Sequence, residues 1–194
     1  VKPGWTQVIL VNNDTKAVKT ISAPMSGDQA DTGSLGLDAK ASYWVFDFWG
    51  QKPVGKIAGT GKLSIALQPG EARVFSVRKV LDRPQIIGTS RHIMCGMMEL
   101  LDVKWNGEKK ELSFTADVVK GEPLVVFFAS GGAYCKTTIP ATEGASKASV
   151  SVSMSNCKSV TDVMSYPVGV VEEAASERPV VKAEKCPATP PAPT

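Results

Sequence analysis

The chain has 194 residues, a formal net charge of +3 and 43% hydrophobic residues, enough apolar material for one large domain or two small ones. Its Lys and Arg residues are spread along the sequence, so we expect no nucleic-acid partner. No apolar stretch approaches the roughly 18 residues of a membrane-spanning segment, so we expect no membrane span.

The first part of the chain predicts strands joined by tight turns. Residues 5–11 already form a strand-like run, so we expect Val1 to be a cut inside a longer protein rather than a processed terminus. Residues 62–68 alternate apolar and polar side chains, which predicts a strand with one buried face. After a turn at Pro69-Gly70, residues 72–78 are expected to return as its partner strand.

The second part of the chain has the same character. Asn106-Gly107 is a strong hairpin signal, and residues 111–118 then alternate in hydrophobicity. Residues 124–129 are apolar at every position, which predicts a central strand covered on both faces. Residues 149–155 alternate again, whereas residues 95–101 fit either a helical turn or a strand.

Many short strands separated by Gly and Pro turns predict an all-β fold, an antiparallel β-sandwich of Greek-key type. We expect a first β-sandwich module over residues 1–88. Residues 89–171 form either a second module or the second half of the same sandwich. Residues 172–194 are rich in Glu, Ala, Lys and Pro, which predicts a disordered or partly polyproline tail.

The sequence offers little for catalysis. His92 is the single histidine, and in an extended segment it would share a face with Ser90, but no nucleophile elbow accompanies them. We therefore expect Arg91 and His92 to bond backbone carbonyls at a crossover between sheets. The cysteines form no CxxC pair and the glycines no phosphate loop, so we assign no catalytic residue, no metal and no cofactor.

An aromatic strand over residues 43–49 is the best candidate for binding. Tyr43, Asp47 and Trp49 share one face in an ideal strand, and this combination can stack on a sugar and hydrogen-bond its hydroxyls. The alternative is that this face packs on a neighbouring domain or on the second sheet, since Trp and Tyr are also common anchors at protein interfaces. We favour the packing interpretation.

The four cysteines, at positions 95, 135, 157 and 186, allow disulfides if the protein is exported and free thiols if it is not. Cys135 and Cys157 flank the same hairpin region, so we predict that they pair. The state of Cys95 and Cys186 stays open.

Three segments resemble the C-terminal β-domain of alpha-galactosidase-type (melibiase-like) glycoside hydrolases. They are the aromatic strand at 43–50, the Pro69-Gly70-Glu71 turn, and residues 81–93, which read Leu-Asp-Arg-Pro-Gln-Ile-Ile-Gly-Thr-Ser-Arg-His-Ile. Residues 103–107 resemble the hairpin that follows. The resemblance covers about residues 5–130, and residues 84–93 are its most specific part.

This resemblance implies a β-sandwich attached to a (β/α)8 barrel that carries two catalytic Asp residues. The barrel is absent from this chain, so no residue here inherits a catalytic role. We therefore expect a non-catalytic accessory domain of a secreted, periplasmic or cell-surface glycosidase, with the catalytic barrel as its partner. The alternatives are a carbohydrate-binding module that uses Tyr43 and Trp49, or a structural or adhesion module of a surface protein.

Overall fold

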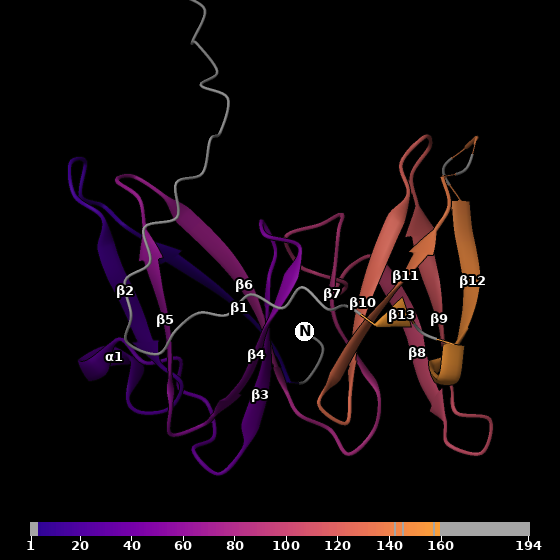
Figure 1. Ribbon diagram of the computed structural model, residues 1–194, viewed down its shortest axis with the longest axis horizontal. Coiled ribbons are helices and arrows are strands. Elements are labelled where there is room, and N and C mark those ends of the chain that lie inside the picture. Colours follow the sequence, from indigo (N-terminus) through magenta and orange to yellow (C-terminus); the bar gives the residue numbers. More distant parts are fainter. Residues whose placement is uncertain (1–3, 142, 145, 157, 160–194) are drawn as a thin grey trace, which may run out of the picture.

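The computed structural model describes residues 4–141, 143–144, 146–156 and 158–159, and the chain over these residues is almost entirely β-structure (Figure 1). The N-terminal strands are β1 (Trp5–Val11), β2 (Lys19–Pro24), β3 (Ser42–Asp47), β4 (Lys52–Ala58), β5 (Lys62–Leu67) and β6 (Ala72–Lys79). The C-terminal strands are β7 (Gln85–Thr89), β8 (Leu100–Asn106), β9 (Glu111–Val118), β10 (Leu124–Ser130), β11 (Ala133–Ile139), β12 (Ser146–Ser153) and β13 (Lys158–Ser159). The all-β prediction is confirmed.

Two short helical elements interrupt the strands. The single turn α1 (Gln29–Thr32) is capped at its N-terminus by Asp28, whose carboxylate accepts a hydrogen bond from the N–H of Ala30. Its C-terminal cap is Gly33, which has a left-handed backbone conformation. The 3-10 turn η1 (Met154–Asn156) follows β12. No helix among the described residues is long and apolar enough to cross a membrane.

The strands form four antiparallel sheets stacked as layers (Figure 1). The N-outer sheet has the order β2-β5 and faces the N-inner sheet, β1-β6-β3-β4. The C-inner sheet, β13-β11-β10-β7, faces the C-outer sheet, β12-β9-β8. The two inner sheets lie against each other, so the molecule is two sandwiches packed back to back.

Three apolar clusters fill the spaces between these layers. The N core lies between the two N-terminal sheets and includes Leu63, Leu67 and Phe75. The C core lies between the two C-terminal sheets and includes Leu112 and Phe128. A middle core joins the two inner sheets, and its buried members are Trp44, Phe46, Phe48, Val74, Ile87, Cys95, Phe127 and Ala129.

Strand β10 shows why the middle core exists. Its alternate residues Leu124, Val126 and Phe128 face the C core, whereas Phe127 and Ala129 face the middle core. The strand lies between β11 and β7, as expected for a central strand covered on both faces. A strand without a polar face needs two apolar neighbours, and the second sandwich provides the other one.

The predicted pairing of residues 62–68 with residues 72–78 is wrong. Strand β5 pairs with β2, and β6 pairs with β1 and β3, so the turn between them crosses from one sheet to the facing one. Buried Asn12 holds this crossing, because its amide donates to the carbonyls of Leu67 and Gln68 at 3.0 Å each. The N–H of Gly70 in turn donates to the carbonyl of Asn12 at 3.1 Å.

The hairpin expected at Asn106-Gly107 is present, since β8 and β9 pair on either side of it. Strand β7 pairs antiparallel with β10 along Gln85–Thr89. Hydrogen bonding therefore groups β7 with the C-terminal sheets, and the expected boundary at residue 88 falls inside this strand.

Candidate functional site

Strand β3 carries the aromatic run at the centre of the candidate site, and both of its faces are buried. Tyr43 and Val45 lie in the N core, while Trp44 and Phe46 lie in the middle core. The Phe46 ring packs on Phe127 of β10, with ring centroids 4.8 Å apart. The aromatic strand therefore serves as part of the contact between the two sandwiches.

Gly88 lies at a point of close contact between the two sandwiches. A Cβ atom added to Gly88 would lie 2.6 Å from Cγ of Phe46, closer than real side chains approach each other. Gly88 belongs to the segment 84–93 and Phe46 to the aromatic strand, which are two of the segments that carry the resemblance. These segments, about 40 residues apart in sequence, form one joint.

Tyr43 and Trp49 do not form the open pair of rings that a sugar platform would need. Tyr43 is 4% exposed, and its hydroxyl donates to the carbonyl of Asp38 at 3.2 Å. Strand β3 ends at Asp47, and the N–H of Gly50 donates to the Asp47 carboxylate at 2.9 Å, which closes a turn. Trp49 lies in this turn, so the strand alternation no longer sets its direction, and its side chain is 57% exposed.

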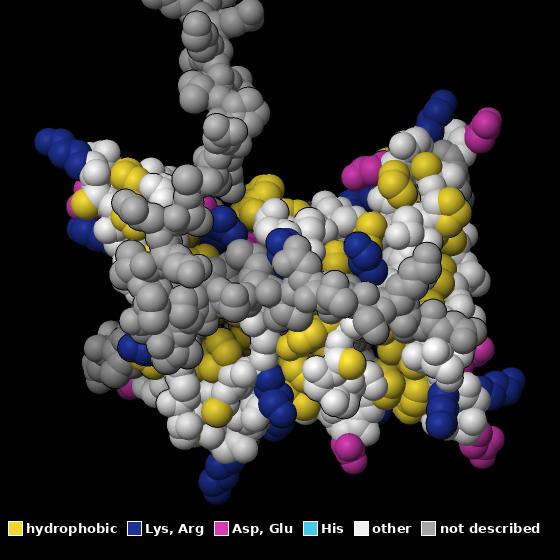
Figure 2. Space-filling model, in the orientation of Figure 1, with side chains coloured by type: hydrophobic (Ala, Val, Ile, Leu, Met, Phe, Trp, Pro, Cys, Tyr) yellow, Lys and Arg dark blue, Asp and Glu magenta, His cyan; other side chains and the backbone are white. Residues whose placement is uncertain are grey.

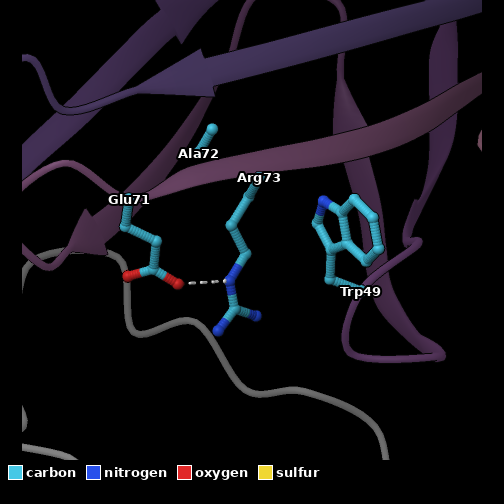
Figure 3. A pocket seen from close by; sticks show the side chains of 4 residues that line it. All are labelled: Trp49, Glu71, Ala72 and Arg73. Carbon is cyan, nitrogen blue, oxygen red and sulfur yellow. Dashed lines mark hydrogen bonds and ion pairs between the residues drawn. The ribbon is translucent and has the colours of Figure 1, made fainter. Parts of the chain in front are cut away.

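An arginine bridges two carboxylates beside Trp49. Arg73 of β6 contacts the fully buried Asp47 at 2.6 Å and Glu71 at 3.0 Å. The other oxygen of Glu71 accepts from the N–H of Gln68 at 2.8 Å. Trp49, Glu71, Ala72 and Arg73 line an open depression, with the Trp49 side chain beside the Glu71–Arg73 pair (Figure 3).

Residues 90–92 are occupied by structural contacts. The Oγ of Ser90 accepts from the N–H of Val125 at 2.9 Å. Arg91 donates to the carbonyls of Asp117 and Glu122, each at 2.8 Å, as expected. His92 differs from the expectation, because its Nδ1 accepts from the N–H of Met94 at 3.2 Å instead of bonding a carbonyl.

A buried polar seam runs beside the middle core. Arg78 of β6 donates to the carbonyl of Cys95 at 2.7 Å, and its guanidinium lies over the ring of Trp5. Burial lowers the pKa of Arg78 well below its usual value, an effect that Cys95 and Glu99 partly oppose. Burial also raises the pKa of the Cys95 thiol to about 12, despite the nearby Arg78 charge. The seam therefore ties the N-inner sheet to the segment that follows β7.

Glu99 is the last residue of the segment between β7 and β8, and it is 6% exposed. One of its carboxylate oxygens accepts a hydrogen bond from the hydroxyl of Thr89, while the other has no hydrogen-bond partner among the described residues. Gln7 of β1 adds a second link to the same segment, because its amide donates to the carbonyl of Met94 at 3.0 Å.

The structure describes two of the four cysteines, Cys95 and Cys135. Cys95 is a buried free thiol, and Cys135 lies in the C core. Cys157 and Cys186 lie outside the described residues, as does the tail at 172–194, so the Cys135–Cys157 bond stays a prediction. Within the part of the chain that the structure describes, no group of three His, Cys, Asp or Glu side chains is placed to hold a metal ion.

Sequence reasoning missed Arg73, Arg78 and Gly88. The two arginines lie in β6, and a charged side chain beside the apolar residues Val74, Phe75 and Val77 of the same strand is the signal that could have marked them. Gly88 stands in the sequence only as one residue of the 81–93 segment, and its role depends on a ring from another sheet.

Comparisons with protein-family models, curated proteins and solved structures find no match to this chain.

Proposed function

We propose that this chain is a non-catalytic accessory β-domain of an alpha-galactosidase-type glycoside hydrolase, whose partner is the catalytic (β/α)8 barrel. The observation that carries the proposal is the contact between Phe46 and Gly88. If the segments that resemble the glycosidase domain were a site for substrate, their side chains would line a cleft. Instead, they pack against each other and join two sandwiches into one body.

The polar groups that might act on a substrate support the same proposal. Asp47 is fully buried against Arg73, Ser90 accepts from a backbone N–H, and so does His92. General acid–base catalysis needs such groups to converge on one reacting bond. Here Asp47 ends β3 whereas Ser90 and His92 follow β7, and each of the three is engaged in holding the fold.

The gene sequence before the codon for Val1 tests this proposal most simply. A reading frame that continues upstream into a (β/α)8 barrel with two catalytic Asp residues is the expected result. A frame that joins the chain to a cell-wall anchor without a barrel would favour the structural or adhesion module instead.

An assay with aryl α-galactosides tests the non-catalytic part. We expect the chain alone to give no turnover. Turnover that disappears in Asp47→Asn or His92→Ala would contradict the proposal, because it would place a reacting group in this chain.

Export to the periplasm, the cell surface or the medium belongs to the same proposal. Strand β13 runs antiparallel to β11 and pairs Ser159 with Cys135, so the two residues that follow Cys157 in the sequence lie beside the strand that carries Cys135. This supports the proposed Cys135–Cys157 disulfide. Thiol titration of the unfolded chain should find fewer than four free thiols, whereas four would contradict the bond and the exported location.

Carbohydrate binding is the second candidate, and the exposure of Trp49 beside Arg73 and Glu71 is the observation that favours it. If it is correct, galacto-oligosaccharides should change the tryptophan fluorescence of the chain, and Trp49→Ala should abolish the change. Trp105→Phe is the matched control, since Trp105 lies in the β8–β9 hairpin. A fluorescence change that persists in Trp49→Ala would exclude Trp49 as the contact.

The surface agrees with a protein or carbohydrate partner better than with a nucleic acid. On the face shown in Figure 2, the Lys and Arg side chains lie dispersed, with hydrophobic side chains exposed between them. Nucleic-acid binding usually needs clustered cations along a face.

A further inference from the structure

Strand β1 is an exposed edge of the N-inner sheet. It pairs with β6 on one side, and no described strand pairs with its other side. The N–H of Asn12 donates to the carbonyl of Glu71, which continues the β1–β6 ladder by one residue. Because bonding direction alternates along a strand, the even residues bond to β6, and Gln7, Ile9 and Val11 direct their N–H and C=O groups away from it.

Two apolar side chains accompany these edge groups. Ile9 is 60% exposed and Val11 is 41% exposed, on the face that looks toward the C-inner sheet. The whole strand, residues 5–11, contains no charged residue, no Gly and no Pro. Natural edge strands usually carry such residues because an uncharged, apolar edge recruits another strand.

The other described edges have this protection. Strand β4 carries Lys52, Pro53 and Lys56 and a bulge against β3. Strand β8 carries Asp102 and Lys104 and also has a bulge. The remaining edges are short, as in β7 and β13, or carry lysines, as in β2, β5 and β12. Among the described strands, β1 alone combines exposed apolar side chains with an unprotected edge.

We propose that β1 pairs antiparallel with β1 of a second copy of this chain, which joins two N-inner sheets into one continuous sheet. An uncharged strand meets itself without like-charge repulsion, and a twofold axis at Ile9 places it opposite Ile9 of the partner subunit. Both residues then direct their backbone groups toward each other, as antiparallel pairing requires. The net charge of +3 opposes the approach of two copies only weakly.

Two sheets that meet only along the edges of one strand each form a contact smaller than the standard protein–protein interface of about 1,600 Å². We therefore expect a weak dimer that dissociates when the protein is diluted. The inference goes beyond the accessory-domain proposal and does not depend on it, since a strand edge can dimerise whether or not a barrel is attached.

Sedimentation equilibrium of the full 194-residue chain tests the proposal. The apparent mass should rise with concentration from 20.6 kDa toward about twice that value. Ile9→Lys should weaken the association by at least about tenfold, because two lysines would face each other across the axis. Val18→Lys is the matched control, since Val18 is 50% exposed outside the strands, and it should associate as the unmodified chain does.

A second measurement needs no variant and is therefore independent of any folding defect. As concentration rises, hydrogen exchange should slow at the amides of Gln7 and Ile9, which face the free edge. The amides of Val8 and Leu10 already bond to β6 and should not respond. A chain that stays monomeric at every concentration overturns the proposal. So does association that survives Ile9→Lys or leaves exchange at Gln7 and Ile9 unchanged.

Discussion

Replacing Gly88 with alanine adds one methyl group at the joint between the two sandwiches. The new Cβ would lie 2.6 Å from Cγ of Phe46, and an ordinary contact begins near 3.4 Å, so the ring or strand β7 must move by roughly 1 Å. Phe46 is fully buried and packs on Phe127, while β7 is held by its bonds to β10. Neither side can yield freely.

Overpacking a buried site typically costs 1–3 kcal/mol, and we expect about 2–3 kcal/mol here because both partners are fixed. Urea unfolding followed by tryptophan fluorescence measures the loss as a lower midpoint at unchanged slope. Gly107→Ala is the control, because its Cβ would meet Nε1 of Trp105 at an ordinary 3.6 Å. This control should stay within about 0.5 kcal/mol of the unmodified chain.

A double-mutant cycle attributes the loss to this contact. Phe46→Leu removes the ring that the new methyl group strikes, so Gly88→Ala should cost about 1 kcal/mol less in that background. If Gly88→Ala has a free energy of unfolding within about 0.5 kcal/mol of the unmodified chain, the steric reasoning is refuted.

Three further changes probe the other contacts, each followed by a direct measurement. Asp47→Asn removes one of the two carboxylate partners of Arg73 and should lower the free energy of unfolding in urea by about 2 kcal/mol, because Arg73 keeps Glu71 and is 18% exposed to water. Arg91→Lys should cost about 1–2 kcal/mol, since lysine cannot bond both carbonyls at once, and an unchanged urea midpoint would contradict this. The thiol of Cys95 is buried and has a pKa of about 12, so it is protonated at pH 8. Iodoacetamide at about pH 8 should therefore leave Cys95 unmodified until urea unfolds the chain. Rapid modification in the native state would contradict the burial of this thiol.

The features that were predictable from sequence are those set by local patterns. Alternation over residues 111–118 identified the buried face of β9, and continuous hydrophobicity over residues 124–129 identified the two-sided burial of β10. Asn106-Gly107 identified its hairpin because the turn chemistry and the pairing are local.

The features that were not predictable depend on which sheets meet. Alternation predicts that β5 buries one face, but it gives the same pattern whether β6 pairs with β5 edge to edge or faces it across a core. The exposure of Trp49 was not predictable because β3 ends two residues earlier at Asp47, so strand alternation no longer sets the direction of this side chain. The close approach at Gly88 follows from back-to-back packing of two sandwiches, which no single segment encodes.

Native-state hydrogen exchange tests most directly whether the middle core joins the two sandwiches into one unit. If it does, neither sandwich opens alone. The slowest-exchanging amides of β3 in the N-inner sheet should then have the same free energy of opening as those of β10 in the C-inner sheet. Free energies that differ by more than about 2 kcal/mol would show that the sandwiches open separately, and would contradict the account of the Phe46–Gly88 joint.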